Sequence, residues 1–177
     1  MVMLAVLGLR KAEIAGLKWR DVREGSILVS RSVVRGIEGP AKTPGSEVAV
    51  TIGPRVQGAL ADWKKHTRFS GPDDYLFSIR IPRPIRMDMV LQKVLKPAGR
   101  KMGVEPLAWH DLRHTCCTLG RREGVQPEVM RRVMRHANIS TTMGFYSHLT
   151  DDNAVRAIEG SLLPDVATRD REVQSVQ

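Results

Sequence analysis

Apolar residues recur every three or four positions along much of the chain, which is the spacing of helices with one buried face. This pattern predicts helices over residues 1–8, 11–17, 87–102, 110–123, 141–148 and 154–163. Two further helices are expected to open at Pro54 and Pro127, because proline fits the first turn of a helix. Ser140 is the expected N-cap of the segment that follows it.

Two shorter runs, residues 26–34 and 47–52, alternate apolar and polar residues as half-buried strands do. Glycine at positions 36 and 39 and proline at position 40 indicate turns between the two runs. Lys42 is therefore expected in or beside a β-hairpin connection. The fold class predicted from the whole pattern is mainly α with a small antiparallel β-sheet, an α+β protein.

The helices of the second half carry a clear apolar face. Leu112, Cys116 and Leu119 share one side of their helix and are expected in the core. In the helix that opens at Pro127, Val133 and the methionines beside it are assigned to the core as well. Charged and imidazole groups fall on other faces of these helices, which leaves them available for chemistry.

The balance of charge indicates a polyanionic partner. The chain has 177 residues, with 28 Lys plus Arg against 19 Asp plus Glu, and a formal net charge of +9. Its isoelectric point is near 10.1. A domain this basic attracts polyanions, of which nucleic acid is the commonest, although a merely basic surface would have the same composition.

The cysteines and the first residues bear on the compartment. Cys116 and Cys117 are adjacent, a spacing that disfavours a relaxed disulfide, so both are interpreted as reduced thiols in a cytoplasmic protein. The apolar opening is too short to span a bilayer and lacks the features of a signal peptide. It reads as a core helix without a start signal, which suggests that the chain begins inside a larger parent protein.

One stretch, from Trp109 to Tyr146, combines a tyrosine with a high density of histidine and arginine. Arginines can hold a phosphate, a histidine can move a proton, and a tyrosine hydroxyl can form a phosphoryl ester. This combination of side chains suits covalent attack on a phosphodiester. A core position for Tyr146, like that of an ordinary aromatic residue, is the alternative.

Four motifs together resemble the signature of the tyrosine recombinases, the phage integrase family. They are GLRKAEI at 8–14, KT at 42–43, HDLRHT at 110–115, and His136 followed by YSH at 146–148. The resemblance covers roughly Val2 to Leu149. It implies a catalytic domain of that fold over residues 1–163, with a polar tail over 164–177. It also implies that the N-terminal DNA-clamping domain of the family is absent from this chain.

The activity implied by the resemblance is DNA strand transfer without a metal or a nucleotide cofactor. By similarity, Tyr146 attacks the scissile phosphate and forms a 3′-phosphotyrosyl link. Arg10 and Arg113 would hold the non-bridging oxygens, Lys42 would protonate the leaving 5′ oxygen, and His110 would help to take the proton from the tyrosine.

The remaining roles in the resemblance are supporting ones. His136 would bond the phosphate, His148 would orient the site, and His114 is assigned mainly to structure. A basic series is expected to meet DNA phosphates in part, and to be a solvated face in part: Arg121, Arg122, Arg131, Arg132 and Arg135. The implied partner is double-stranded DNA, bound by a tetramer of protomers that are monomeric when free, with no membrane association.

The chain also departs from the pattern of the family. The family usually carries a glycine where Arg135 stands, so that this cation would either add a phosphate contact or crowd the site. The adjacent cysteines stand where apolar residues are usual, and buried cysteine behaves as a small apolar residue.

Three other functions remain open from the sequence. A type IB topoisomerase would use the same tyrosine chemistry but reseal the same strand. A zinc hydrolase could use His110 and His114, which lie four residues apart on a helix. A DNA-binding remnant without turnover is the third.

Overall fold

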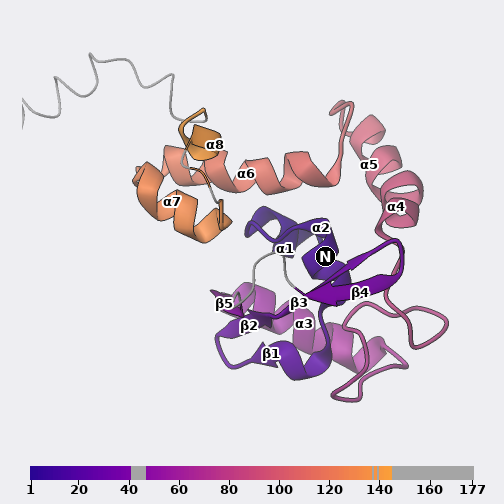
Figure 1. The fold of residues 1–177 in the computed structure, drawn as a ribbon. Coiled ribbons are helices and arrows are strands. Elements are labelled where there is room, and N and C mark those ends of the chain that lie inside the picture. Colours follow the sequence, from indigo (N-terminus) through magenta and orange to yellow (C-terminus); the bar gives the residue numbers. More distant parts are fainter. Residues whose placement is uncertain (41–46, 137, 139, 145–177) are drawn as a thin grey trace, which may run out of the picture.

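The computed structural model describes residues 1–40, 47–136, 138 and 140–144. Figure 1 shows a long helix, α6, running across one side of the molecule, with the strands and α3 on the opposite side and α1 and α2 between them. The helices are α1 Val2–Val6, α2 Lys11–Gly16, η1 Trp19–Asp21, α3 Pro54–His66, α4 Met87–Val90, η2 Leu91–Leu95, α5 Lys96–Lys101, α6 Trp109–Arg122, α7 Pro127–Met134 and α8 Ser140–Met143.

The strands form two small antiparallel sheets in the described part of the chain. One has the order β1-β2-β5, from Val22–Arg23, Ser26–Val29 and Val48–Thr51. The other is a hairpin of β3, Arg31–Val34, with β4, Ile37–Pro40. The predicted class, mainly helical with a small antiparallel sheet, is confirmed, with the strands divided between two sheets.

The single strand predicted over residues 26–34 is wrong, because the chain leaves the first sheet at Ser30 and joins the second. Strand β2 pairs with β5 and strand β3 pairs with β4, so that one continuous run of alternating apolar and polar residues contributes to two sheets. The turn predicted over residues 36–40 is also too long. The turn lies at Arg35 and Gly36, both with positive φ, and Ile37 already pairs with Val34. Proline 40 is tolerated because it lies at the end of an edge strand.

A single large core joins the middle layer to the sheets. Its fully buried members include Leu4, Leu9, Ile14, Ile27 and Leu76, from helices, a strand and a loop. Helix α1 packs against α6, and α2 packs against β3. The short helices α1 and α2 are therefore fixed by neighbours on both sides, as short helices must be, since so few residues form a marginal helix alone.

The buried face of α6 is only partly the one predicted. Leu112 and Cys116 are partly buried and pack against the cores, but Leu119 is 42% exposed. The fully buried stripe is Trp109, Arg113 and Cys117, each four residues apart, and it is centred on an arginine that a pattern of apolar residues could not assign to the interior. Arginine 113 is buried through hydrogen bonds instead, and Cys117 packs with the two methionines of α7, as a small second core. Val133, predicted in the core, is 42% exposed.

The helix predicted over residues 87–102 is confirmed as one helical run, α4–η2–α5, whose middle turn is a π-helix. Pro97 explains this turn. It has no N–H to donate, and in a regular α-helix its ring would collide with the carbonyl of Lys93. A wider turn just before the proline relieves the collision.

Other predictions fall partly outside the described residues. Helix α7 opens at Pro127 and α3 at Pro54, as predicted. Ser140 is the first residue of α8 rather than its cap, and its N–H donates to the side-chain oxygen of Asn138 at 2.9 Å. Both cysteines are free thiols, as predicted. The boundary at 163, the helix over 154–163 and the end of the helix over 141–148 lie outside the described residues. Among the helices described, none is long and apolar enough to cross a membrane.

Candidate functional site

The first part of the site is the tight turn between α1 and α2. Gly8 adopts φ of +89°, a conformation that suits glycine, and a Cβ there would lie 3.0 Å from the sulfur of Met134. The turn delivers Arg10 to the N-cap of α2. Its backbone N–H donates to Oε2 of Glu13 at 2.7 Å, and its Nη1 donates to Oε1 at 2.8 Å. These hydrogen bonds hold the Arg10 side chain, which is still 33% exposed.

Arg113 of α6 approaches the same turn from the buried side. Its guanidinium donates to the carbonyl oxygens of Gly8 and Met134, and the residue is only 3% exposed. Burial, with the nearby charges of Arg10 and Arg135, lowers the pKa of Arg113 to about 10. The guanidinium is therefore still charged at neutral pH. Each terminal nitrogen carries a second N–H beyond those given to the carbonyls.

Arg135 follows the end of α7 and closes the arrangement. Its Nη2 donates to Oε2 of Glu13 at 2.5 Å and to the carbonyl of Gly8 at 3.3 Å. Its own carbonyl accepts from Nη2 of Arg10 at 2.9 Å. Burial alone would raise the pKa of Glu13, but the charge of Arg135 and the hydrogen bonds and charge of Arg10 outweigh it and lower that pKa. The carboxylate of Glu13 is thus shared between two guanidinium groups.

His136 lies next to this cluster. Its Nδ1 is 2.9 Å from the hydroxyl oxygen of Thr142, which is fully buried in α8. If the threonine hydroxyl donates to Nδ1, the proton of the neutral ring resides on Nε2, which can then donate to a ligand. Burial, followed by the charges of Arg113 and Arg10 and by the two histidines of α6, lowers the pKa of His136 to about 4. The imidazole is therefore neutral at neutral pH.

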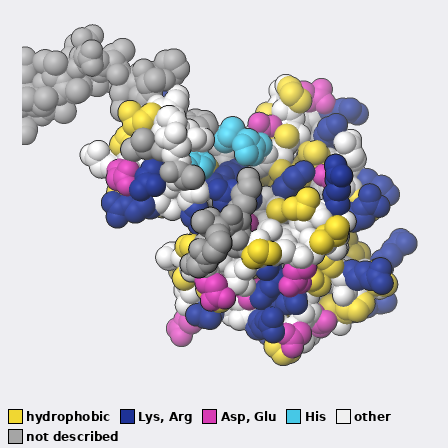
Figure 2. All heavy atoms as spheres, in the orientation of Figure 1, with side chains coloured by type: hydrophobic (Ala, Val, Ile, Leu, Met, Phe, Trp, Pro, Cys, Tyr) yellow, Lys and Arg dark blue, Asp and Glu magenta, His cyan; other side chains and the backbone are white. Residues whose placement is uncertain are grey.

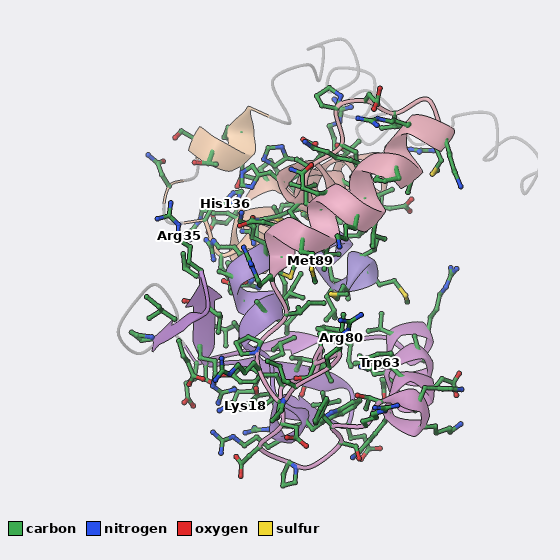
Figure 3. The ribbon with its side chains drawn as sticks, turned by 90° about the vertical axis from the view of Figure 1, so that its right-hand side faces the viewer. Lys18, Arg35, Trp63, Arg80, Met89 and His136 are labelled. Carbon is green, nitrogen blue, oxygen red and sulfur yellow. The ribbon has the colours of Figure 1, made fainter. Side chains whose placement is uncertain are left out.

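Two histidines of α6 complete the described site. The rings of His110 and His114 meet edge to face, with centroids 4.4 Å apart. His110 is exposed and His114 is half-buried. Burial and the neighbouring His110 lower the pKa of His114. Figure 2 shows histidine side chains gathered on the face in view, beside lysine and arginine side chains. In Figure 3, His136 lies in the half of the molecule away from Trp63 and Lys18.

The structure thus brings together Arg10, Arg113 and His136, and adds residues that the sequence reasoning missed. Glu13 had a signal: it lies three residues after the N-cap, where a carboxylate can reach back to the cap's backbone N–H. Thr142 had none, since only tertiary packing brings it to the histidine. Lys42, Tyr146 and His148 lie outside the described residues.

The basic series divides into different environments. Arg135 is turned inward, with its side chain 13% exposed, in the cluster described above. Arg131 pairs with Glu128 at 2.8 Å, and Arg132 lies 3.8 Å from the same carboxylate. Arg122 is exposed and Arg121 is half-buried at the end of α6.

The arrangement suits an anion that offers several oxygen atoms. Two guanidinium groups, those of Arg10 and Arg135, share one carboxylate, and a third, that of Arg113, is held by two backbone carbonyls, with a neutral imidazole beside them. Guanidinium groups bind phosphate oxygens through paired, charge-assisted hydrogen bonds. Among the described residues, no group of three or more His, Cys, Asp or Glu side chains could hold a metal ion.

Comparison with known families identifies the chain. The family model described as "Phage integrase family" matches residues 1–153. The chain belongs to the phage integrase family. The matched residues include every described helix and strand, so that the family model and the described fold cover the same part of the chain.

Several curated integrase-family proteins are similar to this chain. The transposase from transposon Tn916 of Enterococcus faecalis is 28% identical over 173 residues, covering 88% of this chain and 43% of the relative. Tyrosine recombinase XerA of Pyrococcus horikoshii is 30% identical over 168 residues, covering 92% of this chain and 54% of the relative. This chain therefore spans about half the length of the curated relatives it matches.

A solved integrase structure is similar as well. The Tn1549 transposon integrase, in complex with circular intermediate DNA, matches with a TM-score of 0.75 and 26% identity. The match covers 92% of this integrase-family chain and 58% of that protein. The neighbour was therefore captured on DNA with a domain of the same fold.

Proposed function

We propose that this chain is the catalytic part of a site-specific DNA recombinase, which cuts and rejoins strands through a 3′-phosphotyrosyl intermediate. The observation that carries the proposal is the convergence of Arg10, Arg113 and His136 around one turn, with a net excess of positive charge. Family membership and the DNA-bound neighbour support it. The proposed substrate is double-stranded DNA in the cytoplasm, held by a tetramer of protomers.

In the proposed reaction, the phenol oxygen of Tyr146 attacks phosphorus while the bond from phosphorus to the 5′ oxygen breaks. The proton of the phenol passes to His110, and Lys42 protonates the leaving oxygen. A 5′-hydroxyl of the partner strand later attacks the phosphotyrosine and restores the phenol. The ester conserves the energy of the broken bond, so that this scheme needs no nucleotide.

The described residues would act on the charge that develops on phosphate. Arg10, the more exposed guanidinium, would contact a non-bridging oxygen directly, and Arg113 would add its charge from the buried side. His136 would donate from Nε2 as a neutral group. Loss of one preorganised donor to such an oxyanion costs about 3 kcal/mol in other enzymes, which is a rate factor of more than a hundred.

The test is covalent trapping on a nicked duplex, from which the short strand beyond the scissile phosphate is lost after cleavage. The wild-type chain should form a protein–DNA adduct that resists denaturation, and Tyr146→Phe should form none. Tyr75→Phe is the matched control, because Tyr75 and Tyr146 are the two tyrosines of the chain.

The control is chemically informative. The hydroxyl of Tyr75 donates to Glu38 at 2.5 Å, and burial together with that carboxylate raises the pKa of Tyr75 to about 12. It is therefore a poor source of phenolate, and Tyr75→Phe should retain the adduct. An adduct that persists in Tyr146→Phe, or is lost only in Tyr75→Phe, would reject the proposed nucleophile.

A further inference from the structure

Arg135 occupies an unfavourable backbone conformation at the centre of the site. Its φ is +53°, in the left-handed region, where a residue with a Cβ pays about 1 kcal/mol. In addition, its Nε is buried without a hydrogen-bond partner among the described groups. The left-handed backbone and the unpaired Nε are both unfavourable, and such features occur preferentially at functional sites. They indicate that the Arg135 side chain has a function that offsets their cost.

The compensation lies in what the side chain reaches. Nη2 of Arg135 pairs with Oε2 of Glu13 at 2.5 Å, with the two side chains 13% and 6% exposed. The carbonyl of the same residue receives Nη2 of Arg10 at 2.9 Å. Arg135 therefore contacts Arg10 twice, directly through its backbone and indirectly through the shared carboxylate.

The shared carboxylate decides how much positive charge Arg10 can present. Glu13 accepts Nη1 of Arg10 through Oε1 and Nη2 of Arg135 through Oε2. Without the second cation, the full negative charge of this buried group would act on Arg10, and would oppose the approach of an oxyanion. With it, the carboxylate is balanced from the other side.

We infer that Arg135 is a positioning residue that neutralises Glu13 and so leaves the charge and open N–H groups of Arg10 to a phosphate oxyanion. The expected effect on the reaction rate rests on the proposed function, whereas the expected effect on phosphate binding does not. The same role explains why an arginine occupies a left-handed position. A glycine there would have no backbone strain, but Glu13 would then form an ion pair with Arg10 only.

The test is a double-mutant cycle on the 177-residue chain. Arg135→Asn removes the charge while keeping a residue that tolerates the left-handed conformation, and Arg135→Lys keeps the charge. The rate of adduct formation in a single turnover should fall about tenfold in Arg135→Asn and recover most of the loss in Arg135→Lys. In a Glu13→Gln background, Arg135→Asn should cost less than about threefold, because the charge it balances is gone.

A purely structural role predicts another result. Arg135→Asn would then lose the same factor in both backgrounds, and Arg135→Lys, which lacks the planar fork, would not recover it. Either result overturns the inference, as does an unchanged rate in Arg135→Asn.

A second readout separates this inference from the proposed function. Thermal unfolding of the same variants is followed in inorganic phosphate and in chloride at equal ionic strength. Phosphate should raise the melting temperature of the wild-type chain more than that of Arg135→Asn, because the native state binds it more tightly. Equal shifts, or none in the wild type, overturn the inference. An adduct-free wild type with this difference in shifts would reject only the recombinase chemistry.

Discussion

The neutral state of His136 makes the stability of the chain sensitive to acid in a defined window. The pKa of its ring is lowered to about 4 in the fold, first by burial and then by the charges of Arg113 and Arg10. In the unfolded chain the same ring has an ordinary pKa of about 6.5. Between these pKa values, the ring is protonated in the unfolded state but neutral in the folded state. The contribution of this ring to stability should therefore be fully present well above pH 6.5 and should be lost as the pH falls from there toward 4.

The magnitude follows from the difference between the two pKa values. A gap of about 2.5 units corresponds to about 3.4 kcal/mol when the titration is complete, and to about 2 kcal/mol at pH 5. His136 is half-buried rather than fully buried, so that solvent screening reduces the effect. We expect about 1 kcal/mol of stability to be lost through this ring between pH 7 and pH 5.

The measurement is urea unfolding of the wild-type chain and of His136→Asn at pH 7 and pH 5. Asparagine retains an oxygen that can accept the hydroxyl of Thr142, but it does not titrate. The variant should lose about 1 kcal/mol less than the wild type over this interval. The contribution of Glu13 is common to both proteins and cancels. Equal losses in the wild type and His136→Asn would refute the reasoning.

Three further predictions concern packing and hydrogen bonding. Arg113→Lys should destabilise the chain by about 2 kcal/mol in urea unfolding, because a single ammonium group cannot satisfy two buried carbonyls. It should also lower the rate of adduct formation at least a hundredfold. A variant equal to the wild type in both assays would contradict the proposed role of Arg113. Trp109→Phe removes the indole N–H bond of 3.0 Å to a backbone carbonyl of α4, and should cost about 1–2 kcal/mol by the same assay. Gly99→Ala should destabilise by about 2 kcal/mol, because its Cβ would lie 2.6 Å from the carbonyl of Val104, whereas Gly58→Ala in α3, with open space around it, should stabilise by up to about 1 kcal/mol; thermal melts of the pair with equal signs would refute the distinction.

Much of the fold could be predicted because its signals are local. The prolines that open α3 and α7 act within their own turn, and the spacing of apolar residues marks most helices. The alternating run over 47–52 likewise predicts β5, since one face of that strand is apolar. In each case the residues that determine the element lie within it.

The errors arose where the decisive partner is distant in sequence. Arg113 can be buried because the carbonyl groups of Gly8 and Met134 accept hydrogen bonds from its guanidinium. No sequence pattern within α6 indicates these distant partners. Leu119 is exposed for the complementary reason, since the buried stripe is centred on the arginine. The same holds for the candidate site: the motifs predicted that Arg10, Arg113 and His136 would lie together, but not that Arg135 would pair with Glu13.

The carbonyl oxygen of Gly8 accepts from Arg113 and from Arg135, which lie more than a hundred residues later. Contacts so far apart in the chain close large loops, which costs conformational entropy and slows folding. The carbonyl of Gly8 has both partners only while α6 and the end of α7 are docked onto the turn between α1 and α2. A phosphate ion bound at the proposed anion site would hold these three segments together, so that phosphate should increase the resistance of the chain to proteolysis.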